Sequence, residues 1–129
     1  MNYIQTLSAP LGRLFLALIF IVSGVGKISN YAATQGYMEA MGVPSAMLPL
    51  VIALEVLGGI AIVLGFQARF VAFAMAGFSL VSALLFHANF ADQTQMMMFM
   101  KNIAMAGGFL MIVAYGAGPY SLDQRNQLN

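Results

Sequence analysis

Four long apolar stretches limit what this chain can fold into. They cover about residues 11–28, 47–65, 68–88 and 96–115. Each has roughly 18 to 21 residues, enough for an α-helix to cross a hydrocarbon core about 30 Å thick. Backbone groups in lipid must be hydrogen-bonded within the protein, and no stretch alternates polar and apolar residues as a barrel strand does. The sequence therefore predicts an all-α integral membrane four-helix bundle, with residues 1–129 forming a single transmembrane domain.

Composition supports a membrane protein and excludes several other classes. Only 7% of the residues are charged, whereas a soluble domain has about 25%. The net charge of +1 provides no basic surface for nucleic acid. The chain has no cysteine and one histidine, so thiolate and multi-histidine metal sites are excluded. The methionines at 96–98 and 100 have thioethers that suit Cu(I), but we interpret them as apolar side chains and predict no metal site.

The connections between the stretches indicate the topology. Residues 1–10 are a mildly polar lead, and the first stretch is interpreted as a retained span and not as a cleaved signal peptide. The connection over residues 29–46 is the longest. It contains Tyr31 and Tyr37 and ends at glycine and proline, which predicts a short interfacial helix with its tyrosines at headgroup level.

The charges indicate the orientation. Four spans place both termini on the same side of the membrane, together with the arginines Arg13, Arg69 and Arg125. The lysines Lys27 and Lys101 fall on the opposite side. By the positive-inside rule we expect the arginine side to be cytoplasmic, so that both termini face inward.

Glu55 is the one ionisable residue of the second span. A lone carboxylate within a membrane span costs a few kcal/mol, so it needs either a partner or a use. Lys27, His87, Lys101 and Asn102 lie at a similar depth on the other three spans. We therefore predict a polar pocket formed by these five residues, with Lys101 as the first candidate to pair with Glu55 and Lys27 as the second.

Two structural interpretations compete with a functional pocket. Glu55 and Lys101 could form an ion pair that only locks two helices together. Lys27 could extend its ammonium to the interface, and His87 could be an ordinary interfacial residue. The glycines are interpreted as packing residues that let helix backbones approach closely, with room for a flat ligand beside Glu55 as the alternative. They are Gly24, Gly58, Gly59, Gly107 and Gly108.

The chain resembles the DoxX family of small four-helix inner-membrane proteins, most closely its YqjF-like members. The resemblance covers about residues 11–123. The motifs that carry it are Arg13 before an apolar residue, Ser23-Gly24-Val25-Gly26-Lys27, Tyr37-Met38-Glu39, Gly42-Val43-Pro44, Leu54-Glu55 with its glycine pair, Phe86-His87, and Lys101-Asn102 with Gly107-Gly108.

The resemblance implies a multi-pass protein of the bacterial inner membrane. It also implies an accessory role in membrane redox or detoxification chemistry, because some relatives are subunits of quinone-linked oxidoreductases or partners of detoxifying enzymes. On this basis the expected ligand is a quinone or another small molecule. The expected partners are the bilayer and a soluble or membrane oxidoreductase subunit, and catalysis and oligomerisation are left open. The alternatives are a small carrier using the same polar site and a ligand-free structural or assembly factor.

Overall fold

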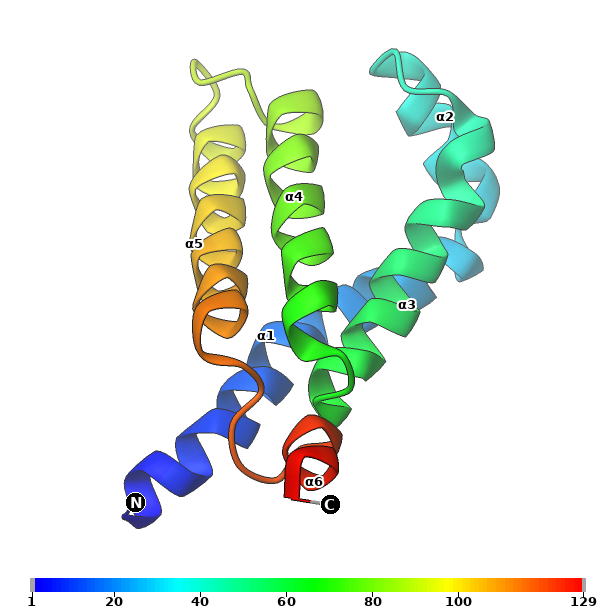
Figure 1. Cartoon of the computed structure of the whole chain (residues 1–129). Coiled ribbons are helices and arrows are strands. Elements are labelled where there is room, and N and C mark those ends of the chain that lie inside the picture. The colour runs from blue at the N-terminus through cyan, green and yellow to red at the C-terminus, as the bar shows by residue number, and fades with distance from the viewer. Residues whose placement is uncertain (1, 129) are drawn as a thin grey trace.

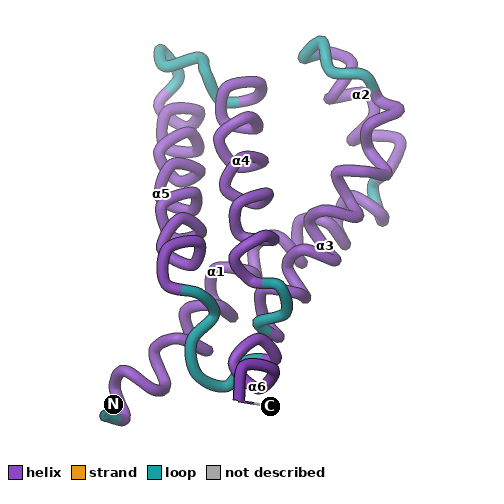
Figure 2. The backbone as a smooth tube through the Cα atoms, viewed as in Figure 1, coloured by secondary structure: helices purple, strands orange, loops and turns teal. Residues whose placement is uncertain are grey.

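The computed structural model describes residues 2–128, which are almost entirely helical (Figures 1 and 2). Four helices are long and apolar enough to cross a membrane, which confirms the predicted four-helix membrane fold. The elements are α1 (Tyr3–Ser29), α2 (Tyr31–Ala40), η1 (Ser45–Met47), α3 (Leu48–Leu64), α4 (Ala68–Phe86), α5 (Gln93–Tyr115) and α6 (Leu122–Leu128).

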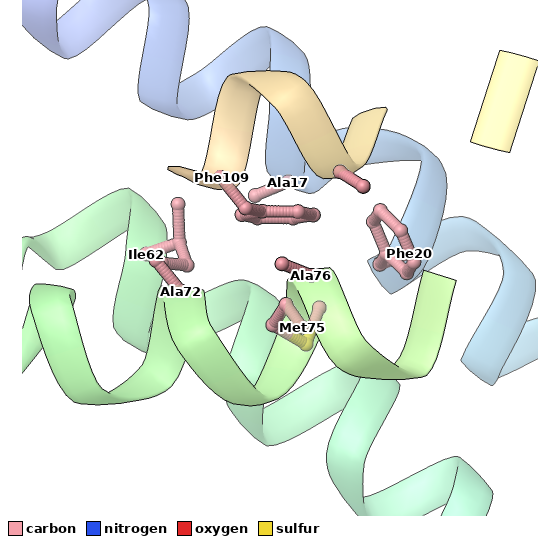
Figure 3. Packing of buried hydrophobic residues seen from close by; sticks show 8 residues of the cluster. Ala17, Phe20, Ile62, Ala72, Met75, Ala76 and Phe109 are labelled. Atoms are coloured by element: carbon pink, nitrogen blue, oxygen red, sulfur yellow. The ribbon is translucent and has the colours of Figure 1, made fainter. Parts of the chain in front are cut away.

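The four long helices pack as two antiparallel pairs. α1 lies mainly against α3, and α4 lies mainly against α5, with fewer contacts between α3 and α4. The pairs meet at a buried apolar cluster that includes Phe20, Ile62, Met75 and Phe109 (Figure 3). The rings of Phe20 and Phe109 have their centroids 5.4 Å apart. Beyond this cluster the two pairs diverge toward the end that carries α2 (Figure 1).

The first helix begins earlier than predicted. It was expected from about residue 11, but α1 starts at Tyr3. The cause is a capping box, in which Gln5 N donates to Asn2 Oδ1 at 2.9 Å and Asn2 N donates to Gln5 Oε1 at 3.4 Å. Such a pair satisfies backbone groups that a helix start would otherwise leave free.

The predicted short helix between the first two spans is confirmed as α2. It lies at the end of the bundle opposite the chain termini (Figure 1). It stops where Gly42 takes a left-handed conformation with φ of 77°, and Val43 N donates back to Met38 O at 2.8 Å. Tyr37 stacks on Phe86 at the end of α4, with ring centroids 5.4 Å apart, so α2 contacts both helix pairs.

The polar C-terminal segment folds back against the bundle. It turns at Gly116 and forms α6 beside the connection between α3 and α4 (Figure 1). Both carboxylate oxygens of Asp123 accept hydrogen bonds at 2.7 Å, one from Gln67 N and one from Ala68 N. Asp123 therefore caps the start of α4, where free backbone N–H groups and the helix dipole favour a negative charge.

Arg13 connects α1 to this end of the bundle. The residue is 2% exposed. Nη1 donates to Val63 O at 2.9 Å, and Nη2 donates to Pro119 O at 2.9 Å and to Tyr120 O at 2.8 Å. A buried charge needs such partners. Arg13, for which the sequence predicted no structural contacts, thus joins α1 to the end of α3 and to the chain before α6.

Candidate functional site

A cavity of about 400 Å³ lies between the two helix pairs, in the half of the bundle away from the termini. Helices α1 to α5 all contribute to its lining. Each of the five polar residues singled out in the sequence lines this cavity: Lys27, Glu55, His87, Lys101 and Asn102. The tertiary fold thus brings together residues that the sequence placed only at a common depth.

Glu55 pairs with Lys27 on the α1–α3 side of the cavity. Lys27 Nζ lies 2.7 Å from Glu55 Oε1 and also donates to Ser23 Oγ at 2.6 Å. The Glu55 side chain is 4% exposed and that of Lys27 is 27% exposed. The prediction that Lys101 would be the first partner of Glu55 is therefore wrong, because α3 packs against α1 whereas α5 packs against α4.

The contact between the two charges is an ion pair by distance. Its geometry is not that of a hydrogen bond, so Glu55 Oε1 has no hydrogen-bond partner among the described residues. Lys27 divides its donors between this carboxylate and Ser23. Ser23, one turn before Lys27, was not among the five residues predicted for the pocket. Residues four apart on a helix are neighbours on its surface, so the spacing of Ser23 and Lys27 could have indicated this contact.

Close packing of α1 on α3 places the ion pair. A Cβ atom at Gly24 would lie 2.6 Å from Val56 Cγ2 and 3.2 Å from Glu55 Cβ. A Cβ atom at Gly59 would lie 2.6 Å from Ile21 Cγ1. Larger side chains at these two positions would push the helices apart, so the glycines let the Glu55 backbone approach α1.

The remaining glycines differ from one another. A Cβ atom at Gly58 would lie 2.8 Å from Met75 Sδ, and one at Gly108 would lie 3.3 Å from the methyl carbons of Leu16. At Gly107 a Cβ atom would meet nothing within 4 Å. The packing role expected for Gly107 therefore has no counterpart among the described residues, because none of their helices lies against that face of α5.

Asn102 and His87 lie on the α4–α5 side of the cavity. Asn102 is buried, and its Nδ2 donates to Ser79 O at 3.1 Å, which joins α5 to α4. His87 directly follows α4, and its backbone N donates to Ala83 O at 3.0 Å. Burial lowers the pKa of His87 below its ordinary value, and the positive charge of Lys101 lowers it further. The imidazole is therefore neutral at pH 7.

Apolar side chains form most of the cavity wall. Leu50, Val51 and Leu54 line it from α3, and Val81 and Leu85 line it from α4. A cavity of this size, mainly apolar and with a few polar groups, is typical of small-molecule sites. The arrangement suits a ligand with an apolar body and a polar head.

The acidic and histidine side chains of the described residues do not gather in one place. These residues contain no group of three or more histidine, cysteine, aspartate or glutamate side chains placed to hold a metal ion. Met96, Met97 and Met100 are exposed on α5, and Met98 and Met105 line the cavity among apolar neighbours.

Comparisons with known proteins agree with the fold. The sequence profile of the DoxX family matches residues 9–88. Inner membrane protein YqjF of Escherichia coli strain K12 is 49% identical over 124 residues, which cover 96% of this chain and 95% of the relative. Inner membrane protein YphA of the same strain is 37% identical over 123 residues, which cover 89% of this chain and 87% of the relative. No solved structure matches the chain.

Proposed function

Because this chain belongs to the DoxX family and is a multi-pass inner-membrane protein, we propose that its cavity binds a small lipophilic molecule with a polar, oxygen-bearing head. A quinone is the representative ligand. The protein would act as an accessory subunit that holds this molecule for membrane redox or detoxification chemistry. It would not itself need to be catalytic.

The observation that carries this proposal is the position of the Lys27–Glu55 pair on the wall of a cavity. A pair that only locked two helices would be expected inside their packed interface. Here the carboxylate is buried, but the lysine remains 27% exposed and both residues line the same hollow as Lys101. Charged groups within membrane proteins usually mark a ligand or ion site, because their burial is costly.

The polar groups match the needs of a quinone head. Quinone carbonyl oxygens accept hydrogen bonds and donate none. Lys101 offers an ammonium, and Asn102 offers the amide hydrogen that it does not donate to Ser79. Leu54, Phe78 and Met105 line the cavity and supply apolar surface for the ring.

A small carrier is the second candidate function. The two helix pairs meet at one apolar cluster and diverge on one side of it (Figure 1). Such a joint would let one pair rock against the other and open the cavity alternately to the two sides. Counterflow of a labelled ligand in liposomes would support the carrier, and binding without counterflow would support the accessory subunit.

Binding is tested with a short-chain ubiquinone analogue and purified protein in detergent. The binding constant is measured by calorimetry, and co-purified lipids are extracted and analysed by mass spectrometry. Leu54→Trp should fill the cavity and weaken binding more than about tenfold, since a filled pocket must expel the ligand. Leu57→Trp is the matched control, because Leu57 lies on the same helix and is 66% exposed.

Two results would contradict the proposal. One is an absence of binding by the parent protein together with an absence of any extracted lipophilic ligand. The other is equal binding by the Leu54→Trp and Leu57→Trp variants, which would place the ligand elsewhere.

A further inference from the structure

The lining of the cavity carries one uncompensated positive charge. Lys27 is paired with Glu55 at 2.7 Å. Lys101 lines the same cavity, and in the described part of the chain no carboxylate lies within ion-pair distance of it. His87 adds little to this charge at pH 7, because burial and then the charge of Lys101 lower the pKa of its imidazole.

The other carboxylates of the described residues are engaged or lie outside the lining. Asp92 caps α5 by accepting from Thr94 N at 2.9 Å, and Asp123 caps α4. Glu39 is exposed on α2 and does not line the cavity. Among the described residues, Lys101 therefore has no acidic partner, and a ligand is the group that could supply one.

Hydrogen-bond donors accompany this charge. Asn102 follows Lys101 on α5, is 8% exposed, and is held by its bond to Ser79 O at 3.1 Å. That bond leaves a second amide hydrogen on Nδ2. His87 contributes one ring N–H in its neutral form. Three donors thus come from the α4–α5 pair, whereas the polar groups of the α1–α3 pair are bound to one another.

We propose that Lys101, Asn102 and His87 form an oxyanion site, and that the cavity binds a lipophilic acid as its anion. The acidic head lies at these donors, and the apolar body lies between α3 and α4. This inference rests on the proposed function and specifies the charge of the ligand. A weak acid crosses lipid in its neutral form, and the lysine then favours the ionised form because hydrogen bonds between charged groups are strong where water is excluded.

The test compares two probes that share one ring system. A 2-hydroxy-3-alkyl-1,4-naphthoquinone is ionised at pH 7, and its 2-methoxy derivative is neutral. Both are titrated into the purified full-length protein in a non-ionic detergent. The parent protein should bind the hydroxy compound at least about tenfold more tightly than the methoxy compound, as expected for a charge-assisted hydrogen bond.

Variants assign the preference to Lys101. Lys101→Met should abolish the difference between the probes, and Lys101→Arg should retain most of it. Arg125→Gln is the matched control, because it also removes one positive charge, and Arg125 is exposed on α6 and does not line the cavity. It should keep the parent preference, and thermal unfolding checks that each variant is folded.

Each remaining outcome overturns the inference. Equal binding of the two probes by the parent, or a preference that survives in Lys101→Met, would show that no oxyanion site depends on Lys101. In both cases the proposed function would stand, since the cavity still binds a lipophilic ring. Binding of neither probe would contradict the inference and the proposed function together.

Discussion

Lys27 and Glu55 form an ion pair that joins the last turns of α1 to the middle of α3, with 2.7 Å between Nζ and Oε1. The pair is asymmetric, because the carboxylate is almost fully buried and the lysine is partly exposed. The two charges neutralise each other on one wall of the cavity. Their coupling therefore bears on both the stability of the α1–α3 interface and the charge presented to a ligand.

The first prediction concerns the coupling between these residues. Lys27→Met should lower the free energy of unfolding by about 3 kcal/mol, because it leaves a buried carboxylate without its partner. Glu55→Gln should cost less, since Lys27 can extend toward water. The double variant should recover most of the loss in thermal unfolding measured in detergent.

The control is a second set of single and double variants, in which Glu55 is combined with Lys101 instead of Lys27. Glu55→Gln and Lys101→Met should be close to additive, because these residues lie on different helix pairs. The opposite result would support the Glu55–Lys101 pair expected from the sequence. In that case the stability losses of Lys27→Met and Glu55→Gln would add, and those of Lys101→Met and Glu55→Gln would be strongly coupled.

The second prediction concerns Gly24. A Cβ atom there would lie 2.6 Å from Val56 Cγ2. Gly24→Ala should therefore destabilise the protein by about 1–3 kcal/mol, since the two helices must separate. Gly26→Ala is the control on the same helix, because a Cβ atom there meets nothing within 4 Å. It should be neutral or stabilising by up to about 1 kcal/mol. Equal effects of the two substitutions would refute the close approach at Gly24.

The third prediction concerns Arg13. Arg13→Met leaves the carbonyls of Val63, Pro119 and Tyr120 without their donor. It should cost at least about 3 kcal/mol, because hydrogen bonds from charged groups are lost and buried acceptors stay unsatisfied. Amide hydrogen exchange should increase around residues 116–123. Arg125→Gln serves as the control. If amide protection in Arg13→Met equals that of the parent, Arg13 does not hold the C-terminal segment against α1.

The fourth prediction concerns orientation. The arginines lie at the end with the termini, so α2 should face the periplasm and α6 the cytoplasm. The chain has no cysteine, so a single introduced cysteine is the only thiol of this protein that a maleimide can label. In intact cells a membrane-impermeant maleimide should label Glu39→Cys and leave Leu122→Cys unlabelled until the membrane is opened. The reversed pattern would invert the assigned topology and place the cavity mouth on the cytoplasmic side.

The fifth prediction concerns the methionines of α5. Met96, Met97 and Met100 are exposed on a membrane-spanning helix. Replacing all three by leucine should change stability by less than about 1 kcal/mol, since the exchange conserves apolar volume. Stoichiometric copper in the parent that disappears in the triple variant would contradict this interpretation.

Segment length and composition were sufficient to predict the four spans and the short helix between the first two. Helices that must satisfy their backbone within lipid leave few alternatives. The early start of α1 was not predicted, because Pro10 and the polar residues before it were interpreted as a lead outside the helix. The capping box at Asn2 and Gln5 starts the helix before them. The return of the C-terminal segment to the start of α4 could not be predicted, because the contacts of Asp123 with Gln67 and Ala68 span more than fifty residues of sequence.

The sequence by itself determined the depth of each polar residue, because 1.5 Å of rise per residue places Lys27, Glu55 and Lys101 in the same half of the membrane. Only the tertiary structure decided which of them meet. Glycines at 24 and 59 bring α3 against α1, so the flexible stem of Lys27 reaches Glu55. Lys101 lies on the other helix pair, and none of the carboxylates in residues 2–128 pairs with it. Depth is a property of one helix, whereas an ion pair depends on which helices are neighbours, and side-chain packing decides that.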